Sequence, residues 1–257
     1  TIALKSLNLK KNSEVIIPAM TYCSTAFSVL NANLKPVLVD TDFLSSTIDI
    51  DKIKKKITKK TKVIMPVHLC GTSCDMASIA ALASRYGFHV LEDASHAIGG
   101  RYQGEPVGSC SYSAITVFSF HPVKIITTGE GGLATTNNPH LAQRMADLRS
   151  HGITKDVHRF ERTPIGPWSY EQQDLGFNYR MTDLQAALGL SQLQRLDEIV
   201  AERNRQLQIY RELLTMLPVQ LLTVPDDVLS SLHLAVIRFA DPRPEHHLRV
   251  FEGLRAA

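Results

Sequence analysis

Lys124 and Asp93 are the residues whose types and surroundings point most directly to chemistry. Lys124 follows the apolar run 115–118 and lies in a turn-rich segment that ends in the glycines 131–132. Asp93 closes another hydrophobic run, 88–92, where a strand is expected to end. A lysine and an aspartate at strand ends suit Schiff-base chemistry on pyridoxal phosphate (PLP). The lysine holds the cofactor's aldehyde, and the carboxylate keeps the pyridine nitrogen protonated.

The neighbours of Lys124 distinguish it from an ordinary surface lysine. Pro122, Ile125 and Ile126 surround it with apolar groups, which desolvate an ammonium group, lower its pKa and make it a better nucleophile. Asp93 also has plainer interpretations, as a helix cap or a metal ligand. Glu92 alternates to the other face of the strand, so we expect it to lie away from the site.

Three further side chains are candidates for holding the cofactor. His96 could hydrogen-bond the phenolic oxygen of the ring, although a single histidine is commonly a packing residue. Ser119, just before the lysine turn, is a natural phosphate ligand, although most serines are simply solvated. Tyr22 follows the first predicted strand and could stack its flat face on the pyridine ring.

The segment 68–75 raises the question of zinc, because it contains His68, Cys70, Cys74 and Asp75. It has no second pair of cysteines or histidines at ligand spacing, and turn-forming residues lie between. We therefore predict no metal site, and interpret the segment as a loop that closes the ligand crevice.

Apolar runs alternate with helical patterns from residue 14 onward. The expected strands are 14–19, 36–40, 62–68, 88–92, 113–118 and 133–136, and the expected helices are 25–34, the lysine-rich 52–62 region and 75–86. This order predicts an α/β fold with a mainly parallel sheet covered by helices on both faces. Ligands bind such sheets at the carboxyl ends of the strands, where Asp93 and Lys124 fall.

The second half of the chain changes character. After Pro139 we expect a helix, a polar loop over 151–177 and long helices over 182–217. The composition shifts at 218–225, which predicts a large domain over 1–217 and the start of a small α/β domain over 218–257. The chain opens without methionine in an apolar-periodic segment and stops within a helical pattern, so we expect both domains to be truncated.

Composition is that of a globular protein, with 257 residues, 44% hydrophobic and 21% charged. The net charge of +3 is too small to favour nucleic acid, and the lysines of 52–62 fit the solvent face of a helix. Four cysteines without disulfide spacing favour a reducing compartment. No run reaches membrane-spanning length and no signal peptide is evident, so we predict a cytoplasmic protein without a membrane partner.

Several motifs occur in the order found in a known family: 14–18, 68–76, 92–96, 118–132 and 176–183. Together they resemble the DegT/DnrJ/EryC1/StrS family of PLP-dependent sugar aminotransferases. The resemblance implies PLP-dependent transferase fold type I, with a sheet of the seven-stranded type. It also implies a homodimer with shared active sites.

The resemblance implies a role toward PLP for eight residues. Lys124 would form the Schiff base, and Asp93 would pair with the pyridine nitrogen. His96 would lie at the oxygen side of the ring, and Tyr22 would stack on the ring. The phosphate would be contacted by Thr1, Ile2 and Ser119 of the same chain and by Asn178 of the neighbouring subunit. Thr1 matches the end of a phosphate loop, so we expect that the earlier part of this loop is missing and that the segment could be inactive alone.

Segments 120–124 and 166–173 look most like the pseudaminic-acid enzymes of this family. These aminate C4 of a UDP-4-keto-6-deoxy-N-acetylhexosamine with glutamate as donor. Ile125 departs from the proline common in relatives and could shift the loop. The alternatives are a related sugar dehydratase, in which histidine commonly replaces the lysine, and a non-catalytic sugar-nucleotide-binding module. Lys124 argues against the dehydratase.

Overall fold

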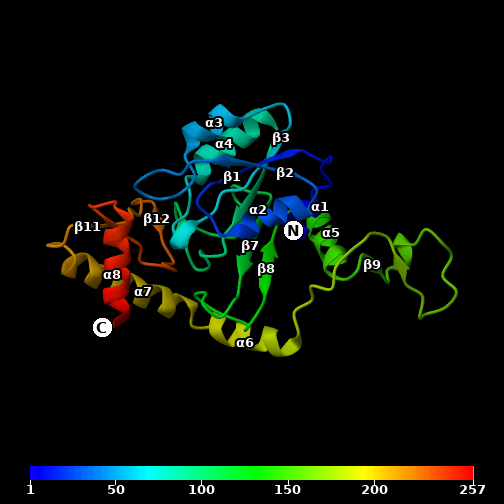
Figure 1. Ribbon diagram of the computed structural model, residues 1–257. Helices are drawn as coiled ribbons and strands as arrows, with labels where there is room; N and C mark the ends of the chain where they lie inside the picture. The colour runs from blue at the N-terminus through cyan, green and yellow to red at the C-terminus, as the bar shows by residue number, and fades with distance from the viewer. Residues whose placement is uncertain (257) are drawn as a thin grey trace.

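A six-stranded sheet organises the computed structural model, which describes residues 1–256 (Figure 1). The strand order is β2-β1-β3-β4-β7-β8, with β8 antiparallel to five parallel strands. The strands are β1 (Glu14–Pro18), β2 (Lys35–Val39), β3 (Thr61–Ile64), β4 (His89–Asp93), β7 (Ile115–Ser119) and β8 (Gly132–Thr135). The prediction of a mainly parallel α/β sheet is confirmed.

Helices cover both faces of this sheet, as the strand sequences require. In β1, Ile16 packs into one apolar cluster while Val15 and Ile17 pack into another on the opposite face. The first cluster includes residues of α3 and α4, and the second includes residues of α1, α2 and α5. These helices are α1 (Ile2–Ser6), α2 (Cys23–Asn31), α3 (Ile50–Lys56), α4 (Met76–Tyr86) and α5 (Pro139–Arg149).

Element boundaries follow local chemistry. Asp75 caps α4 by accepting a hydrogen bond from the backbone N–H of Ser78 (3.1 Å), and Gly87 ends the helix at φ +69°, as predicted. The expectation that the third strand runs to residue 68 was wrong, because β3 ends at Ile64. Pro66 has no N–H to donate to the ladder, and only an isolated bridge between Val67 and Asp93 continues the pairing.

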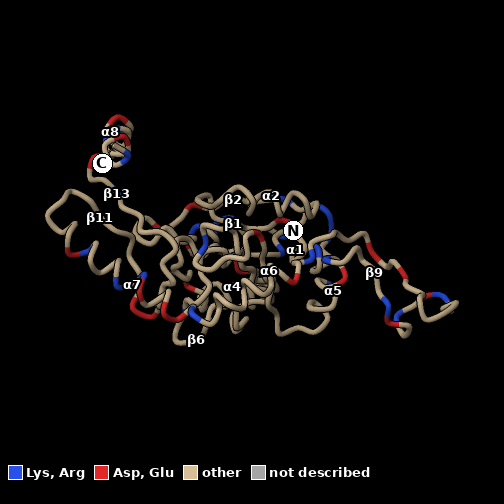
Figure 2. The backbone as a smooth tube through the Cα atoms, turned by 90° about the horizontal axis from the view of Figure 1, so that it is seen from below, with Lys and Arg blue, Asp and Glu red and all other residues tan. Residues whose placement is uncertain are grey.

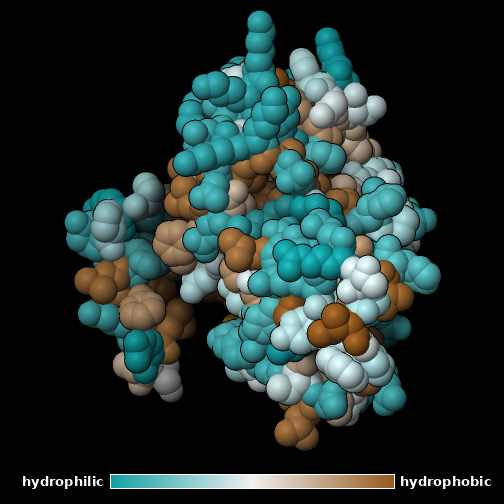
Figure 3. Space-filling view, turned by 90° about the vertical axis from the view of Figure 1, so that its right-hand side faces the viewer, coloured by the Kyte–Doolittle hydropathy of each residue, from teal (hydrophilic) through white to brown (hydrophobic). Residues whose placement is uncertain are grey.

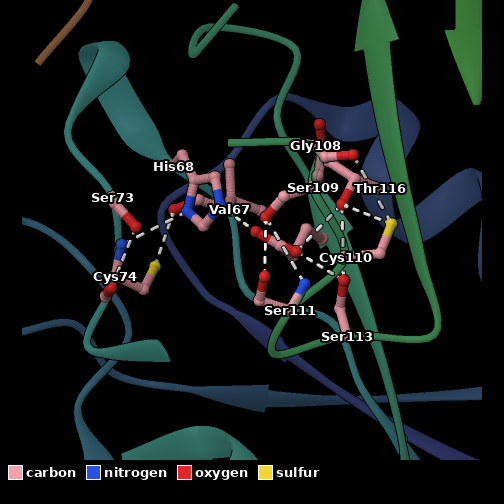
Figure 4. Close-up of polar contacts among 12 residues, drawn as sticks. Val67, His68, Ser73, Cys74, Gly108, Ser109, Cys110, Ser111, Ser113 and Thr116 are labelled. Atoms are coloured by element: carbon pink, nitrogen blue, oxygen red, sulfur yellow. Dashed lines mark hydrogen bonds and ion pairs between the residues drawn. The ribbon is translucent and has the colours of Figure 1, made fainter. Parts of the chain in front are cut away.

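A buried polar network lies between β4 and β7 and the loops that follow β3 and precede β7 (Figure 4). His68 is fully buried, and its Nε2 lies 2.8 Å from Oε2 of Glu92. The other carboxylate oxygen of Glu92 accepts hydrogen bonds from the hydroxyls of Thr116 (2.9 Å) and Ser113. The backbone N–H of Cys74 donates to Nδ1 of His68 (3.2 Å), so Nε2 carries the proton that is donated to Glu92.

Residues 151–178 leave the main body as a long excursion (Figures 1 and 2). It contains a short antiparallel pair, and two helices follow, the first begun by a capping box at Thr182. These elements are β9 (Ile153–Thr154), the 3-10 turn η2 (Val157–Arg159), β10 (Glu171–Gln172), α6 (Asp183–Leu193) and α7 (Leu196–Leu213). The prediction of a polar loop followed by long helices is confirmed in outline.

The last part of the chain pairs in two places. Strands β11 (Val219–Leu221) and β13 (Ile237–Phe239) pair with each other, and α8 (Pro244–Ala256) follows. Between them, β12 (Val228–Leu229) joins β5 (Arg101–Tyr102) and β6 (Glu105–Pro106) in a three-stranded sheet. A separate small domain over 218–257 stays a prediction, and its final residue lies outside the described residues.

Acidic and basic residues are scattered along the backbone (Figure 2). Helix α3 has seven residues and buries Ile53, in line with the predicted solvent face of its lysines, but the expectation that this helix extends to residue 62 was wrong, because α3 ends at Lys56 and β3 begins at Thr61. None of the helices within residues 1–256 combines the length and the apolar composition needed to cross a bilayer.

We predict that His68→Ala destabilises the protein by about 3–5 kcal/mol, because it removes one partner of a buried, charge-assisted pair and leaves Glu92 short of a donor. Urea denaturation followed by circular dichroism measures the loss. His140→Ala, at an exposed histidine, is the control and should change the midpoint little. Equal, small shifts in both variants would contradict a structural role for the pair.

Candidate active site

A closed loop after β7 carries Lys124. The loop is shut by backbone hydrogen bonds from Phe120 N–H to Gly131 O (2.9 Å) and from Thr128 N–H to Phe120 O (3.0 Å). Within it, the N–H of Lys124 donates to His121 O (2.9 Å). The lysine is half-buried because the residues after it, Ile125 among them, pack into an apolar cluster. Ile125 therefore anchors the loop, whatever its departure from the family pattern.

Helix α6 fixes the outer side of this loop. The side chain of Gln192 accepts from the N–H of Thr127 (2.9 Å), and the side chain of Gln185 donates to Glu130 O (2.8 Å). The approach requires small residues, since a Cβ at Gly189 would lie 2.8 Å from Cγ2 of Thr128. The sequence analysis missed these contacts, because helical spacing alone does not say what a helix packs against.

Asp93 is the last residue of β4, and both of its carboxylate oxygens accept hydrogen bonds. Thr25 Oγ1 donates to Oδ2 (2.9 Å), while Ser95 Oγ (2.6 Å) and Ser95 N–H (3.2 Å) donate to Oδ1. Thr25 is itself 2.7 Å from the hydroxyl of Thr21. These bonds fix the carboxylate in one orientation. Ser95 lay within a motif already identified, whereas Thr25 gave only a weak signal, a pair of threonines four residues apart.

Lys124 and Asp93 influence each other electrostatically. Burial lowers the pKa of Lys124 from its ordinary value, and the negative charge of Asp93 offsets part of that shift. The amine is therefore neutral more often than that of a solvated lysine, and the charge of Asp93 acts on it. This confirms the predicted desolvation of Lys124.

His96 belongs to the same electrostatic centre. Burial, together with the charge of Lys124, lowers the pKa of His96 to about 4, and Asp93 opposes the shift. Its Nδ1 accepts a hydrogen bond from the backbone N–H of Cys70 (3.2 Å). At neutral pH the ring is therefore uncharged, and its Nε2 carries the proton as a donor.

A cavity of about 830 Å³ opens at this end of the sheet. Asp93 and its two donors line it, and so do Thr1 and Ile2, whose phosphate role stays a prediction. The cavity lining does not include Lys124, His96 or Ser119. The volume lies within the range of small-molecule sites. The cavity lining also includes residues of β8 and α5.

The remaining predicted residues lie as follows. Ser119 is the half-buried last residue of β7, and Tyr22 is 75% exposed at the N-terminus of α2. Asn178 is exposed and forms an isolated bridge with Ser150, while its neighbour Tyr179 lines the cavity. The roles of Ser119, Tyr22 and Asn178 toward a cofactor stay predictions.

The segment 68–75 holds the buried pair with Glu92 described above. Both ring nitrogens of His68 have protein partners, and Cys74 Sγ donates to Val67 O (3.2 Å). Among residues 1–256, no three side chains of His, Cys, Asp or Glu are grouped so that they could hold a metal ion.

These groups fit PLP. The structure offers an amine with a lowered pKa for the aldehyde, a fixed carboxylate for the ring nitrogen and a cavity that extends to Thr1. A mainly parallel sheet with these groups at its carboxyl ends defines a PLP-dependent transferase of fold type I. The chain belongs to the DegT/DnrJ/EryC1/StrS aminotransferase family, whose sequence profile matches residues 1–257. Its cofactor class is therefore PLP, as the sequence predicted.

Comparison with individual proteins supports this assignment. GDP-perosamine synthase of Caulobacter vibrioides is 44% identical over 216 residues, covering 84% of this chain and 55% of the relative. PseC of Helicobacter pylori, an aminotransferase of pseudaminic-acid biosynthesis, superimposes with a TM-score of 0.88 at 28% identity, covering 99% of this chain and 67% of its own. A putative sugar aminotransferase of Streptococcus pneumoniae, Spr1654 in its PMP form, gives 0.87 at 30% identity, covering 99% and 70%. The chain spans about half the length of the curated relatives it matches.

We predict that Asp93→Asn lowers the pKa of Lys124 further, because the carboxylate charge that raises it is removed while burial remains. The rate of Lys124 modification by an amine-reactive reagent, followed against pH by peptide mapping of the cofactor-free protein, measures this pKa. The rate profile should move to lower pH. Asp75→Asn, at a helix cap, is the control and should leave the profile in place. An unchanged or raised pKa in Asp93→Asn would contradict the coupling.

Proposed function

We propose that the whole protein transfers an amino group, from glutamate, to C4 of a nucleotide-linked 4-keto-6-deoxy sugar. The observation that carries this proposal is the fixed carboxylate of Asp93, whose charge acts on the half-buried amine of Lys124, in a chain of the sugar aminotransferase family. Bound PLP supplies an electron sink for the carbon that loses a proton.

Lys124 has two tasks in this proposal. Its lowered pKa gives a neutral amine that can add to the cofactor's aldehyde. Once released, the same amine is a base that carries a proton away from the amino donor and returns it to the sugar. The loop bonds to α6 keep the amine in place for both steps.

Six residues would hold and orient the cofactor. Asp93, fixed by Thr25 and Ser95, would pair with the ring nitrogen and keep it protonated. His96 would donate its Nε2–H at the oxygen side of the ring, and Tyr22 would stack on the ring. For the phosphate we propose Thr1, Ile2 and Ser119, two of which line the cavity with Asp93.

Two nucleotide sugars deserve comparison as substrates. Segments 120–124 and 166–173 favour a UDP-linked sugar of the pseudaminic-acid type, and PseC is a close structural relative. The higher identity to GDP-perosamine synthase, 44%, favours a GDP-linked sugar. We propose the UDP-linked sugar as first candidate and the GDP-linked sugar as second. The presence of Lys124 continues to disfavour a dehydratase, and family membership disfavours a non-catalytic module.

We also propose a homodimer whose subunits share active sites. Asn178 is exposed and lies against the end of α5. The excursion just before it carries exposed apolar side chains, Ile165 and Trp168, and α6 carries Leu184. Figure 3 shows apolar groups among hydrophilic ones on the face at the excursion's end. Such a surface suits contact with a second copy.

Four free cysteines and a nucleotide-sugar substrate fit a cytoplasmic location.

We predict that the whole protein, loaded with PLP, converts one of a panel of UDP- and GDP-linked 4-keto-6-deoxy sugars to the 4-amino sugar when glutamate is present. Mass spectrometry of the products identifies the amino sugar and the nucleotide. Lys124→Ala is the control and should give no product, because it lacks the amine. Product from the GDP sugars alone would favour the second candidate. Failure with every keto sugar, by a protein that binds PLP at Lys124, would contradict the proposed substrate class.

We predict that mixing inactive Lys124→Ala with inactive Asn178→Ala restores about a quarter of wild-type activity, under conditions that allow subunits to exchange. In a shared site, half of the randomly paired dimers are mixed, and each mixed dimer has one intact site of two. Native mass spectrometry confirms exchange. No recovery despite confirmed exchange would place Asn178 at its own chain's site and contradict sharing.

A further inference from the structure

Two histidines far apart in the sequence are in contact just after β4. The ring centroids of His96 and His233 are 4.3 Å apart, and the ring planes are tilted by 44°. His96 follows β4 in the centre of the large sheet, whereas His233 lies between β12 and β13. The charge of Lys124 lowers the pKa of both histidines, so both belong to its surroundings.

The peptide groups of Cys70 connect the two histidines. The N–H of Cys70 donates to Nδ1 of His96 (3.2 Å), and the C=O of Cys70 accepts from the N–H of His233 (2.8 Å). Cys70 has the left-handed conformation, φ +60°, which is uncommon for a residue with a side chain. This backbone strain is retained at the point where both histidines are held.

The segment that carries His233 is docked along its length. Ser231 donates through its N–H to Gly71 O (3.2 Å) and through its hydroxyl to His96 O (3.0 Å). Gly71 has room for no side chain, since a Cβ there would lie 2.6 Å from Leu232 N. From α7, Arg203 donates to Leu232 O (3.2 Å). The ring of His233 is therefore placed by its backbone, and not by bonds of its own.

One atom of this ring is an exception to the hydrogen bonding around it. Nδ1 of His233 is buried and has no hydrogen-bond partner. Among residues 1–256 it is the one buried side-chain nitrogen or oxygen atom in that situation. An unpaired buried polar atom costs free energy, and a phenylalanine ring would fill the same space without that cost. What His233 contributes here is therefore the flat ring that lies against His96, which phenylalanine would keep.

The charged groups around the pair favour neutral rings. Burial, then His96, Lys124 and Arg203, lower the pKa of His233 to about 4. The pKa of His96 is also about 4, with Asp93 as the opposing negative charge. The neutral ring of His233 contacts the ring of His96 without adding a positive charge to the surroundings of Lys124.

We propose that His233 is a positioning residue that holds the His96 ring on the N–H of Cys70 and thereby fixes Nε2 of His96 as the hydrogen-bond donor in the active centre. The hydrogen bond from Cys70 restricts rotation of the His96 ring within its plane, and the His233 ring restricts tilting out of it. The proposal rests on the proposed aminotransferase function but not on which sugar is used.

The test follows the tautomer of His96 in the whole protein labelled with ¹⁵N-histidine, without added substrate. The His96 signals are assigned by difference with His96→Gln. In wild type, Nδ1 should be unprotonated and Nε2 protonated. In His233→Leu the His96 ring loses its flat neighbour and should give signals of both tautomers. In His233→Phe, which keeps a flat ring, the wild-type tautomer should return.

A matched control separates ring contact from backbone docking. Ser231→Ala removes the hydroxyl bond to His96 O but leaves both rings, and it should keep the wild-type tautomer. The kcat of the PLP-loaded His233→Leu enzyme should fall roughly tenfold to a hundredfold, the size expected for a misplaced catalytic group, and His233→Phe should recover most of it. The KM for the sugar should change little.

An unchanged His96 tautomer in folded His233→Leu would overturn the proposal, even if activity fell. If His233→Leu does not fold, His233→Gln removes the flat ring with a polar side chain and is judged by the same criterion. A tautomer that changes as predicted in a protein that aminates none of the sugars tested would keep the positioning role and reject the substrate class instead.

Discussion

The pairing of β4 with β7 is the constraint on which the site depends. Glu92 and Asp93 are neighbours in β4, so their side chains point to opposite faces, and a register shift by one residue would exchange them. The bond from Thr116 to Glu92 joins two residues paired directly across these strands, and His68 holds the same carboxylate from the next loop. Because Glu92 is fixed in the buried network, Asp93 is fixed in the cavity, where Thr25 and Ser95 orient it.

The lysine loop depends on a second constraint, which comes from outside the sheet. A lysine that must react needs an environment dry enough to lower its pKa and open enough to admit a substrate. Ile125 and Ile126 meet the first requirement by anchoring the loop in an apolar cluster, and Asp93 limits the shift by its charge. Gln185 and Gln192 of α6 then bind the backbone of the loop, so the side chain of Lys124 is not needed to hold the loop in place.

The fold and the centre of the site were predictable from the sequence, whereas the groups that position them were not. Strand ends, Asp93 and Lys124 follow from local patterns of apolar residues and turns, which act over a few positions. Thr25 and His233 act across long separations in the chain, and nothing in their neighbours marks them. The excess length predicted for the third strand has a local cause, since Pro66 interrupts the ladder without interrupting the apolar pattern. Asn178 and Tyr22 are exposed in the single chain, and their roles toward the cofactor stay predictions.

The docked segment around His233 has a consequence for the part of the chain that follows. β13 begins at Ile237, a few residues after His233, and pairs with β11, so the C-terminal unit is tied closely to the active centre. If the residues after Ile237 rotate, there are two outcomes. Either the backbone between His233 and Ile237 changes conformation, or His233 moves with them. The bonds from Arg203 and Asn204 to residues 230–233 favour the first outcome, because they hold the docked segment to α7. The bonds to α7 thereby separate the geometry at His96 from movement of the residues after Ile237, while the lysine loop is held by α6 and Asp93 by Thr25 and Ser95.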